Sequence, residues 1–235
     1  MKKQSEGATG LTFGVSAYLI WGSFPLIITA ASFANPFEVV VWRVVFGFLF
    51  AALLVTLTRT WAQTVELVRS PKKLGWVAVA SLFIFVNWSV YVVAVATSNV
   101  LETSLGYFIN PLITVLFAVV FLKEKLRKGQ WAALGIGLIA VVILTFDYGR
   151  PPWIALVLAI SFATYSLAKN RVGGKIKALQ SFTIESGIVL PFVLVQLWIV
   201  SMFTPIMIFS GVVEASILIS FGILTAIPLI LFGAA

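Results

Sequence analysis

The sequence has 235 residues, of which 61% are hydrophobic and 10% charged, and a mean hydropathy of +1.10, which together indicate a polytopic membrane protein and exclude an ordinary soluble domain. A net charge of +8 could indicate nucleic-acid binding in a soluble protein. Here the basic residues stand in short segments between apolar runs, so membrane topology explains them better and no nucleic-acid partner is expected. Without Cys or His, disulfides, thiol chemistry and the usual zinc ligand sets are excluded, and no cofactor is expected.

Eight apolar runs predict an all-α bundle of about eight transmembrane helices. They cover approximately residues 10–32, 36–58, 74–97, 100–122, 130–146, 152–169, 178–203 and 213–235. The first run follows ten mostly polar residues without a small-residue cleavage site, so we interpret it as a retained span rather than a signal peptide. Short linkers throughout indicate that no soluble domain is inserted.

The basic residues predict the orientation of these spans. Fourteen of the sixteen fall before the first span or in alternate linkers: Lys2, Lys3, Arg59, Arg69, Lys72, Lys73, Lys123, Lys125, Arg127, Lys128, Lys169, Arg171, Lys175 and Lys177. The opposite connections contain only Arg150, and Arg43 lies inside a span. By the positive-inside rule, the N-terminus is cytoplasmic and the chain is a multi-pass protein of the cell membrane.

The first and third spans each carry a face of aromatic residues. Tyr18 and Trp21 share one helix face in the first span, and Asn87, Trp88 and Tyr91 lie together in the third. These residues are candidates for lining a pathway. Two alternatives stay open: aromatic packing beside a kink in the first span, and an interhelical hydrogen bond from Asn87.

Capping patterns precede the second and fourth spans. Asn35-Pro36-Phe37-Glu38 resembles a capping signature, so we interpret Glu38 as a cap rather than a proton carrier. The pattern of 99–102 repeats it, with Glu102 as the corresponding cap. The linker 58–73 is either a short amphipathic helix on the cytoplasmic surface or a solvated connection.

A polar stripe in the fourth span is the strongest candidate for the wall of a transport pathway. One helix face there carries Ser104, Tyr107, Asn110, Pro111 and Thr114. Pro111 has no N–H group, so the Tyr107 carbonyl loses its helical donor. Such a stripe is tolerated at membrane depth only where it faces protein or water.

Helix depth brings the three candidate faces to one level. A helix rises about 1.5 Å per residue through about 30 Å of hydrocarbon. On that scale the aromatic faces of the first and third spans meet Tyr107 and Asn110 near the middle of the bilayer. Transporter binding sites usually lie at this level.

The second half of the sequence repeats features of the first. Residues 81–96 align with 220–235 without gaps at low identity, and Arg150-Pro151-Pro152-Trp153 marks a candidate repeat boundary. Small residues at 132–137 suit close helix packing.

Seven strings resemble the RarD-type permeases, in the EamA-like branch of the drug/metabolite transporter superfamily. They are Tyr18-x-x-Trp-Gly-x-x-Pro25, Glu38-x4-Arg43, Asn87-Trp88-x-x-Tyr91, Ser104-Leu-Gly-Tyr-Phe-Ile-Asn-Pro-Leu112, Gly149-Arg-Pro-Pro-Trp153, Glu185-x5-Pro191 and Thr225-Ala-Ile-Pro-Leu229. The resemblance implies ten spans in two inverted five-helix repeats with both termini cytoplasmic. It places the first repeat at 8–147 and a partial second repeat of three helices at 150–235.

The resemblance also implies function. It implies secondary-active export of small metabolites or drugs, with a link to chloramphenicol sensitivity in the family name. It leads us to expect that the last two spans are missing here, as in a fragment or truncated gene. A transport-incompetent fragment or assembly partner is therefore kept as the alternative. An enzyme is not expected, because no nucleophile–base pair, metal set or paired carboxylates share a face.

Two charges inside spans form a separate hypothesis. Aligning Pro36–Arg43 over Ala178–Glu185 puts Arg43 and Glu185 at equivalent repeat positions, so they enter from opposite faces. We expect an ion pair or gated charge relay between them, with snorkelling of each to its nearer interface as the alternative. Glu185 is the predicted proton-coupling group, since Arg stays charged. The expected partners are a small-molecule substrate and the lipid bilayer, while proton coupling and a homodimer stay open.

Overall fold

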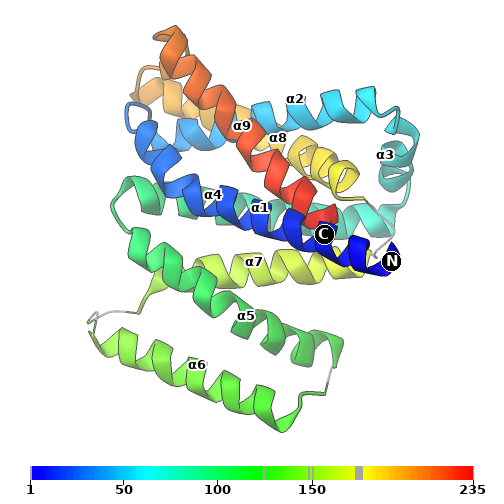
Figure 1. Cartoon of the computed structure of the whole chain (residues 1–235). Helices are drawn as coiled ribbons and strands as arrows, with labels where there is room; N and C mark the ends of the chain where they lie inside the picture. The colour runs from blue at the N-terminus through cyan, green and yellow to red at the C-terminus, as the bar shows by residue number, and fades with distance from the viewer. Residues whose placement is uncertain (1, 124, 148, 150, 173–176, 235) are drawn as a thin grey trace.

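Each predicted apolar run forms a helix in the computed structural model, which describes residues 2–123, 125–147, 149, 151–172 and 177–234. Figure 1 shows their arrangement. The helices are α1 (Lys2–Ala30), α2 (Pro36–Leu57), α3 (Trp61–Val68), α4 (Pro71–Ala96), α5 (Val100–Leu122), α6 (Lys128–Asp147), α7 (Trp153–Val172), α8 (Ala178–Phe203), the 3-10 turn η1 (Met207–Phe209) and α9 (Val212–Ala234). The predicted all-α membrane bundle is confirmed.

Seven of the described helices are long and apolar enough to cross a membrane: α1, α2, α4, α5, α7, α8 and α9. The apolar stretch of α6, Lys128–Ile143, is shorter. Helix α4 begins earlier than predicted because Pro71 occupies its first turn, where a missing N–H group costs nothing. Helix α7 continues past its apolar stretch, so Lys169 lies in its last turn rather than in a linker.

The linker between α2 and α4 forms the short helix α3, as one of the two alternatives predicted. Thr64 and Leu67 are buried, while Trp61 and Val65 are exposed. Leu67 packs in one apolar cluster with Val172 of α7 and Ile184 of α8. Helix α3 therefore covers the ends of two spans.

The long helices pack in a regular pattern. Helix α2 packs against α8 and α9, α4 against α7 and α8, α1 against α9, and α5 against α7. Helix α6 packs along α5 at the edge of the bundle (Figure 1). The two main apolar clusters lie between α2 and α4 and their partners from the second half of the chain. The core is thus the interface between the two halves.

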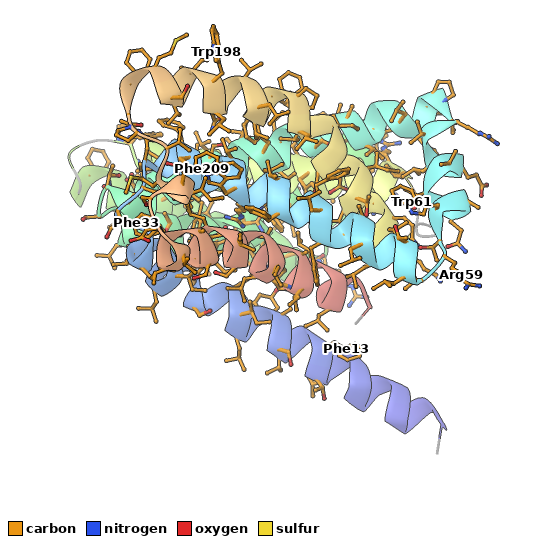
Figure 2. The ribbon with its side chains drawn as sticks, turned by 90° about the horizontal axis from the view of Figure 1, so that it is seen from above. Phe13, Phe33, Arg59, Trp61, Trp198 and Phe209 are labelled. Atoms are coloured by element: carbon orange, nitrogen blue, oxygen red, sulfur yellow. The ribbon has the colours of Figure 1, made fainter. Side chains whose placement is uncertain are left out.

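The basic connections lie together. Arg59 and Trp61 stand at one end of the bundle and Phe33 and Phe209 at the other (Figure 2). Arg171, near the end of α7, donates from Nη2 to the carbonyl oxygen of Phe121 at the end of α5, at 2.9 Å. The ends of α2, α5 and α7 therefore share one side, with α3 across it.

The predicted caps are correct only in part. Asn35 Oδ1 accepts a hydrogen bond from the Phe37 N–H group at 3.0 Å, as the pattern predicts. Asn99 makes no such bond to α5, because its amide instead donates to the Thr97 carbonyl and hydroxyl. The interpretation of Glu38 as a cap of its own helix is wrong, because its carboxylate binds a loop from the other half of the chain.

Candidate functional site

Arg43 is the central charge of the candidate site. Its side chain projects from α2 into the bundle and is only 4% exposed. The guanidinium carbon lies 4.9 Å from the ring centres of both Phe24 on α1 and Trp88 on α4, within the range of cation–π attraction. Within the described part of the chain, neither Nε nor Nη1 of Arg43 has a hydrogen-bond partner.

An aromatic layer continues from Arg43 towards α5. Trp88 meets Phe182 of α8, with ring centres 6.3 Å apart. Tyr91 lies one turn from Trp88 and meets Tyr107 of α5 edge to face, at 5.8 Å. Tyr91 is buried, whereas Tyr107 is 43% exposed. The layer therefore runs from the buried guanidinium to the edge of the bundle.

The polar stripe of α5 faces away from α7. The opposite face of α5 packs closely against α7 at Gly106. A Cβ atom at Gly106 would lie 3.0 Å from the Ala155 carbonyl oxygen and from Leu158 Cβ, so a larger residue would require α7 to shift by a few tenths of an ångström. Thr114 donates to the side-chain carbonyl of Asn110 at 3.3 Å. With Ser104, Tyr107 and Pro111 at least partly exposed, the stripe is the free face of α5.

Asn87 joins α4 to α7. Its amide nitrogen donates to the Leu158 carbonyl oxygen and to the Ser161 hydroxyl, each at 3.0 Å, and the side chain is 1% exposed. These bonds are the interhelical hydrogen bonds that the sequence analysis gave as the alternative for Asn87. A role for Asn87 in lining a pathway stays a prediction.

Tyr18 of α1 lies apart from the layer, whereas Trp21 packs against the apolar cluster that contains Tyr91. Tyr18 is 64% exposed and packs its ring edge to face against Trp21, with centres 5.5 Å apart. It borders a shallow groove along α1 with Leu11, Val15 and Leu19. In Figure 2 this half of α1, marked by Phe13, extends away from the other helices. Within the described contacts, it is Phe24 that brings α1 to Arg43.

Glu185 belongs to a second polar cluster, formed by α7 and α8. Its Oε1 accepts hydrogen bonds from Lys169 Nζ at 2.7 Å and from the Ser181 hydroxyl at 2.6 Å. Its Oε2 accepts from the Tyr165 hydroxyl at 3.3 Å. Lys169 Nζ also donates to Ser181, at 2.6 Å. Glu185 is 2% exposed, while the Lys169 side chain is 30% exposed.

The structure does not pair Arg43 with Glu185. Within the described residues, the ion pair of Glu185 is with Lys169, and the Arg43 guanidinium lies over the rings of Phe24 and Trp88. The physical reason is depth: the two charges enter from opposite ends, and Lys169 reaches Glu185 from its own end. A relay in which they meet during a transport cycle stays a prediction.

Glu38 fastens a loop from the other half of the chain. Its carboxylate accepts hydrogen bonds from the Met207 N–H group at 2.9 Å, the Ile208 N–H group at 3.2 Å and Trp42 Nε1 at 3.0 Å. The carboxylate therefore caps η1 instead of α2. It holds the α8–α9 connection against the start of α2.

Sequence reasoning missed the partners Lys169, Tyr165, Ser181 and Phe24. Composition assigned Lys169 to a basic linker. Tyr165 and Lys169 are nevertheless four residues apart, and so are Ser181 and Glu185. That shared helical spacing was the available signal. Within the described residues, no three acidic side chains lie close enough to hold a metal ion.

Comparisons with known proteins agree with this arrangement of apolar helices around a charged, aromatic centre. The profile of the EamA-like transporter family matches residues 8–146. Protein RarD of Streptomyces exfoliatus is 40% identical over all of this chain and 74% of its own length. The uncharacterized transporter YojE of Bacillus subtilis is 34% identical, over 98% of this chain and 78% of its own. Protein RarD of Escherichia coli is 32% identical, over 96% and 76%.

One solved crystal structure shares the fold. It superimposes with a TM-score of 0.62 at 20% sequence identity, covering 97% of this chain and 78% of that protein. Fold and relatives together define a multi-pass membrane transporter. The chain belongs to the EamA-like transporter family, and its relatives place it with the RarD-type permeases.

Proposed function

We propose that the chain is a secondary-active permease of the cell membrane for small metabolites or drugs, with its pathway between the two halves near the bilayer midplane. The observation that carries this proposal is the cluster of Arg43, Trp88, Tyr91 and Tyr107. It combines a buried charge, two N–H groups without acceptors among the described residues, and aromatic surfaces from different helices. Polar groups at membrane depth usually mark substrate or ion pathways.

The proposed pathway follows the free face of α5. Tyr107 and Asn110 form its wall on α5, opposite Trp88 and Tyr91 on α4. Asn87 supports this wall from behind through its bonds to α7. Tyr18 lies on the exposed part of α1, so its contribution depends on a conformation in which α1 closes towards α5, whereas Trp21 already packs against the apolar cluster that contains Tyr91.

Inverted repeats over 8–147 and 150–235 complete the proposal. Part of the packing supports them: exchanging α1 with α7, α2 with α8 and α4 with α9 turns the α4–α7 contact into α1–α9 and the α2–α9 contact into α4–α8, and leaves α2–α8 unchanged. The α5–α7 contact has no counterpart among the described helices. We propose a cytoplasmic N-terminus from the distribution of basic residues. Glu185, with Lys169 and Tyr165 around it, is the proposed proton-coupling group.

Counterflow in proteoliposomes tests the transport function. A Pseudomonas aeruginosa relative is named chloramphenicol-sensitive protein RarD, so chloramphenicol is a suitable first probe. Vesicles preloaded with unlabelled chloramphenicol should transiently accumulate the radiolabelled compound. Tyr107→Ala and Asn110→Ala should slow this exchange at normal protein yield. Phe108→Ala is the matched control, because Phe108 is 83% exposed on the same helix.

Two outcomes of the counterflow experiment would contradict the proposal. If correctly inserted protein exchanges neither chloramphenicol nor any compound of a small-metabolite panel, the transport proposal is wrong. The assembly-partner alternative then accounts for the bundle. If the control and Tyr107→Ala lose activity equally, the pathway does not follow α5.

A further inference from the structure

Among the described residues, no carboxylate is paired with the buried Arg43 guanidinium. Arg43 is 4% exposed, and its Nε and Nη1 groups have no acceptor within the described residues. A buried cation loses its hydration, and proteins normally compensate with a paired charge and hydrogen bonds. Phe24 and Trp88 attract the charge through their ring electrons, but such rings do not replace hydrogen-bond acceptors in the plane of the guanidinium.

Two of the buried carboxylates, Glu38 and Glu185, already bind donors of their own, and the third, Glu102 in the first turn of α5, also makes an interaction of its own. Glu38 accepts the backbone N–H groups of Met207 and Ile208. Glu185 accepts from Lys169, Ser181 and Tyr165. Recruiting either one would leave other buried groups unpaired. An anion from outside the described residues is therefore the better counter-charge for Arg43.

The surroundings of Arg43 indicate the chemistry of that anion. Trp88 lies against the guanidinium at 4.9 Å, and one turn along α4 the ring of Tyr91 meets that of Tyr107 at 5.8 Å. Tyr107 is partly exposed and connects the site to the free face of α5. A planar guanidinium can donate to both oxygens of a carboxylate. Next to it, Trp88, Tyr91 and Tyr107 offer contact surface for an apolar or aromatic body.

We propose that Arg43 binds the carboxylate of a transported small molecule whose apolar or aromatic body packs against Trp88, Tyr91 and Tyr107. The inference rests on the transport function proposed above and adds a substrate class to it: monocarboxylates with a compact apolar body. Phe24 and Trp88 hold the guanidinium in position before the substrate arrives.

Matched acid and amide probes test the charge requirement. The full chain in nanodiscs of zwitterionic lipid is incubated with radiolabelled phenylacetate, and bound label is competed with unlabelled phenylacetate or phenylacetamide. Phenylacetate should compete at least about tenfold better than phenylacetamide, because only the carboxylate pairs with Arg43. Equal competition by the two compounds, or no specific binding of phenylacetate, benzoate or hexanoate, overturns the proposal.

Substitutions assign the effect to Arg43. Arg43→Gln should weaken phenylacetate binding about ten- to a hundredfold, and Arg43→Lys should weaken it less, because the charge remains. Arg69→Gln removes an exposed arginine and should change nothing. If Arg43→Gln does not fold, the acid–amide comparison on wild type and Arg43→Lys decides. Unchanged phenylacetate affinity in a folded Arg43→Gln variant refutes the assignment.

Two further measurements distinguish a carboxylate substrate site from a lipid site and from a site without transport. Displacement of phenylacetate by added phosphatidylglycerol would assign Arg43 to a lipid headgroup and refute a substrate site. Chloramphenicol counterflow without carboxylate binding would refute the anion site while the transport function stands. Carboxylate binding that depends on Arg43, without flux of any compound, would support the site and refute transport.

Discussion

At the scale of single residues, three buried charges of the bundle have three different surroundings. Glu38 is neutralised by N–H groups of a distant loop, and Glu185 by an ammonium and two hydroxyl groups. Arg43 is surrounded by aromatic rings. A carboxylate with several hydrogen-bond donors is stable without water, whereas a guanidinium with free N–H groups favours binding of an anion.

The Glu185 cluster gives a prediction for coupling. Glu185→Gln keeps the shape of the side chain but removes the charge opposite Lys169. Uptake driven by a proton gradient should be lost, while counterflow without a gradient persists. The unfolding free energy should fall by only about 1–3 kcal/mol, because Lys169 remains partly solvated.

Two measurements check this coupling prediction. Flux is compared with and without an imposed pH gradient, and thermal unfolding is recorded in nanodiscs. Glu66→Gln, at an exposed acid on α3, is the control. Proton-driven flux that survives in Glu185→Gln would remove Glu185 from the coupling mechanism.

Residue partners were harder to predict from sequence than residue depth. Rise per residue predicted that Tyr91 and Tyr107 lie at one level, and their rings are in contact. The bonds of Glu38 join residues 169 and 170 positions apart in the sequence. A local capping pattern therefore suggested the wrong helix terminus. Arg43 and Glu185 enter the bundle from opposite ends, as the sequence predicted. Helical spacing alone did not predict that the Lys169 side chain extends into the bundle and binds Glu185.

At the scale of helices, glycine allows α2 and α9 to cross closely. A Cβ atom at Gly222 would overlap the backbone of Gly47 and Phe46 on α2. Close backbone approach through small residues is a common way to pack membrane helices. The sequence predicted such packing for the small residues at 132–137, and the structure shows it at Gly137, where a Cβ atom would overlap the Leu112 side chain of α5, but not at Gly135, which has open space around it. Apolar runs therefore located the helices, but composition alone did not identify their contacts.

The α2–α9 crossing gives the second prediction. Gly222→Ala should destabilise the protein by about 1–3 kcal/mol or more, because neither backbone can move aside without disturbing the core. Gly135→Ala is the control and should be neutral or slightly stabilising, since alanine is the better helix former. Yield and monodispersity in size-exclusion chromatography report the difference. Equal behaviour of the two variants would show that the crossing tolerates a methyl group.

At the scale of the whole molecule, the packing pattern and the charge distribution support the same topology. Each half contributes helices that pack mainly against the other half. A bundle built this way can rearrange by moving one half against the other about a central site. In the proposed repeat alignment, Arg43 and Glu185 occupy equivalent positions with opposite charges. The two halves therefore present different chemistry at matching places.

The distribution of basic residues gives the last prediction, on orientation. Arg59 and Trp61 lie at the end of the bundle opposite Phe33 and Phe209 (Figure 2), and the positive-inside rule places the basic end in the cytoplasm. Since the chain has no cysteine, single substitutions can be labelled without background. Cysteine at Ser32 or Phe209 should react with an impermeant thiol reagent added to intact cells. Cysteine at Lys72 or Lys128 should react only after the membrane is opened, and labelling of Lys128→Cys from outside would reverse the topology.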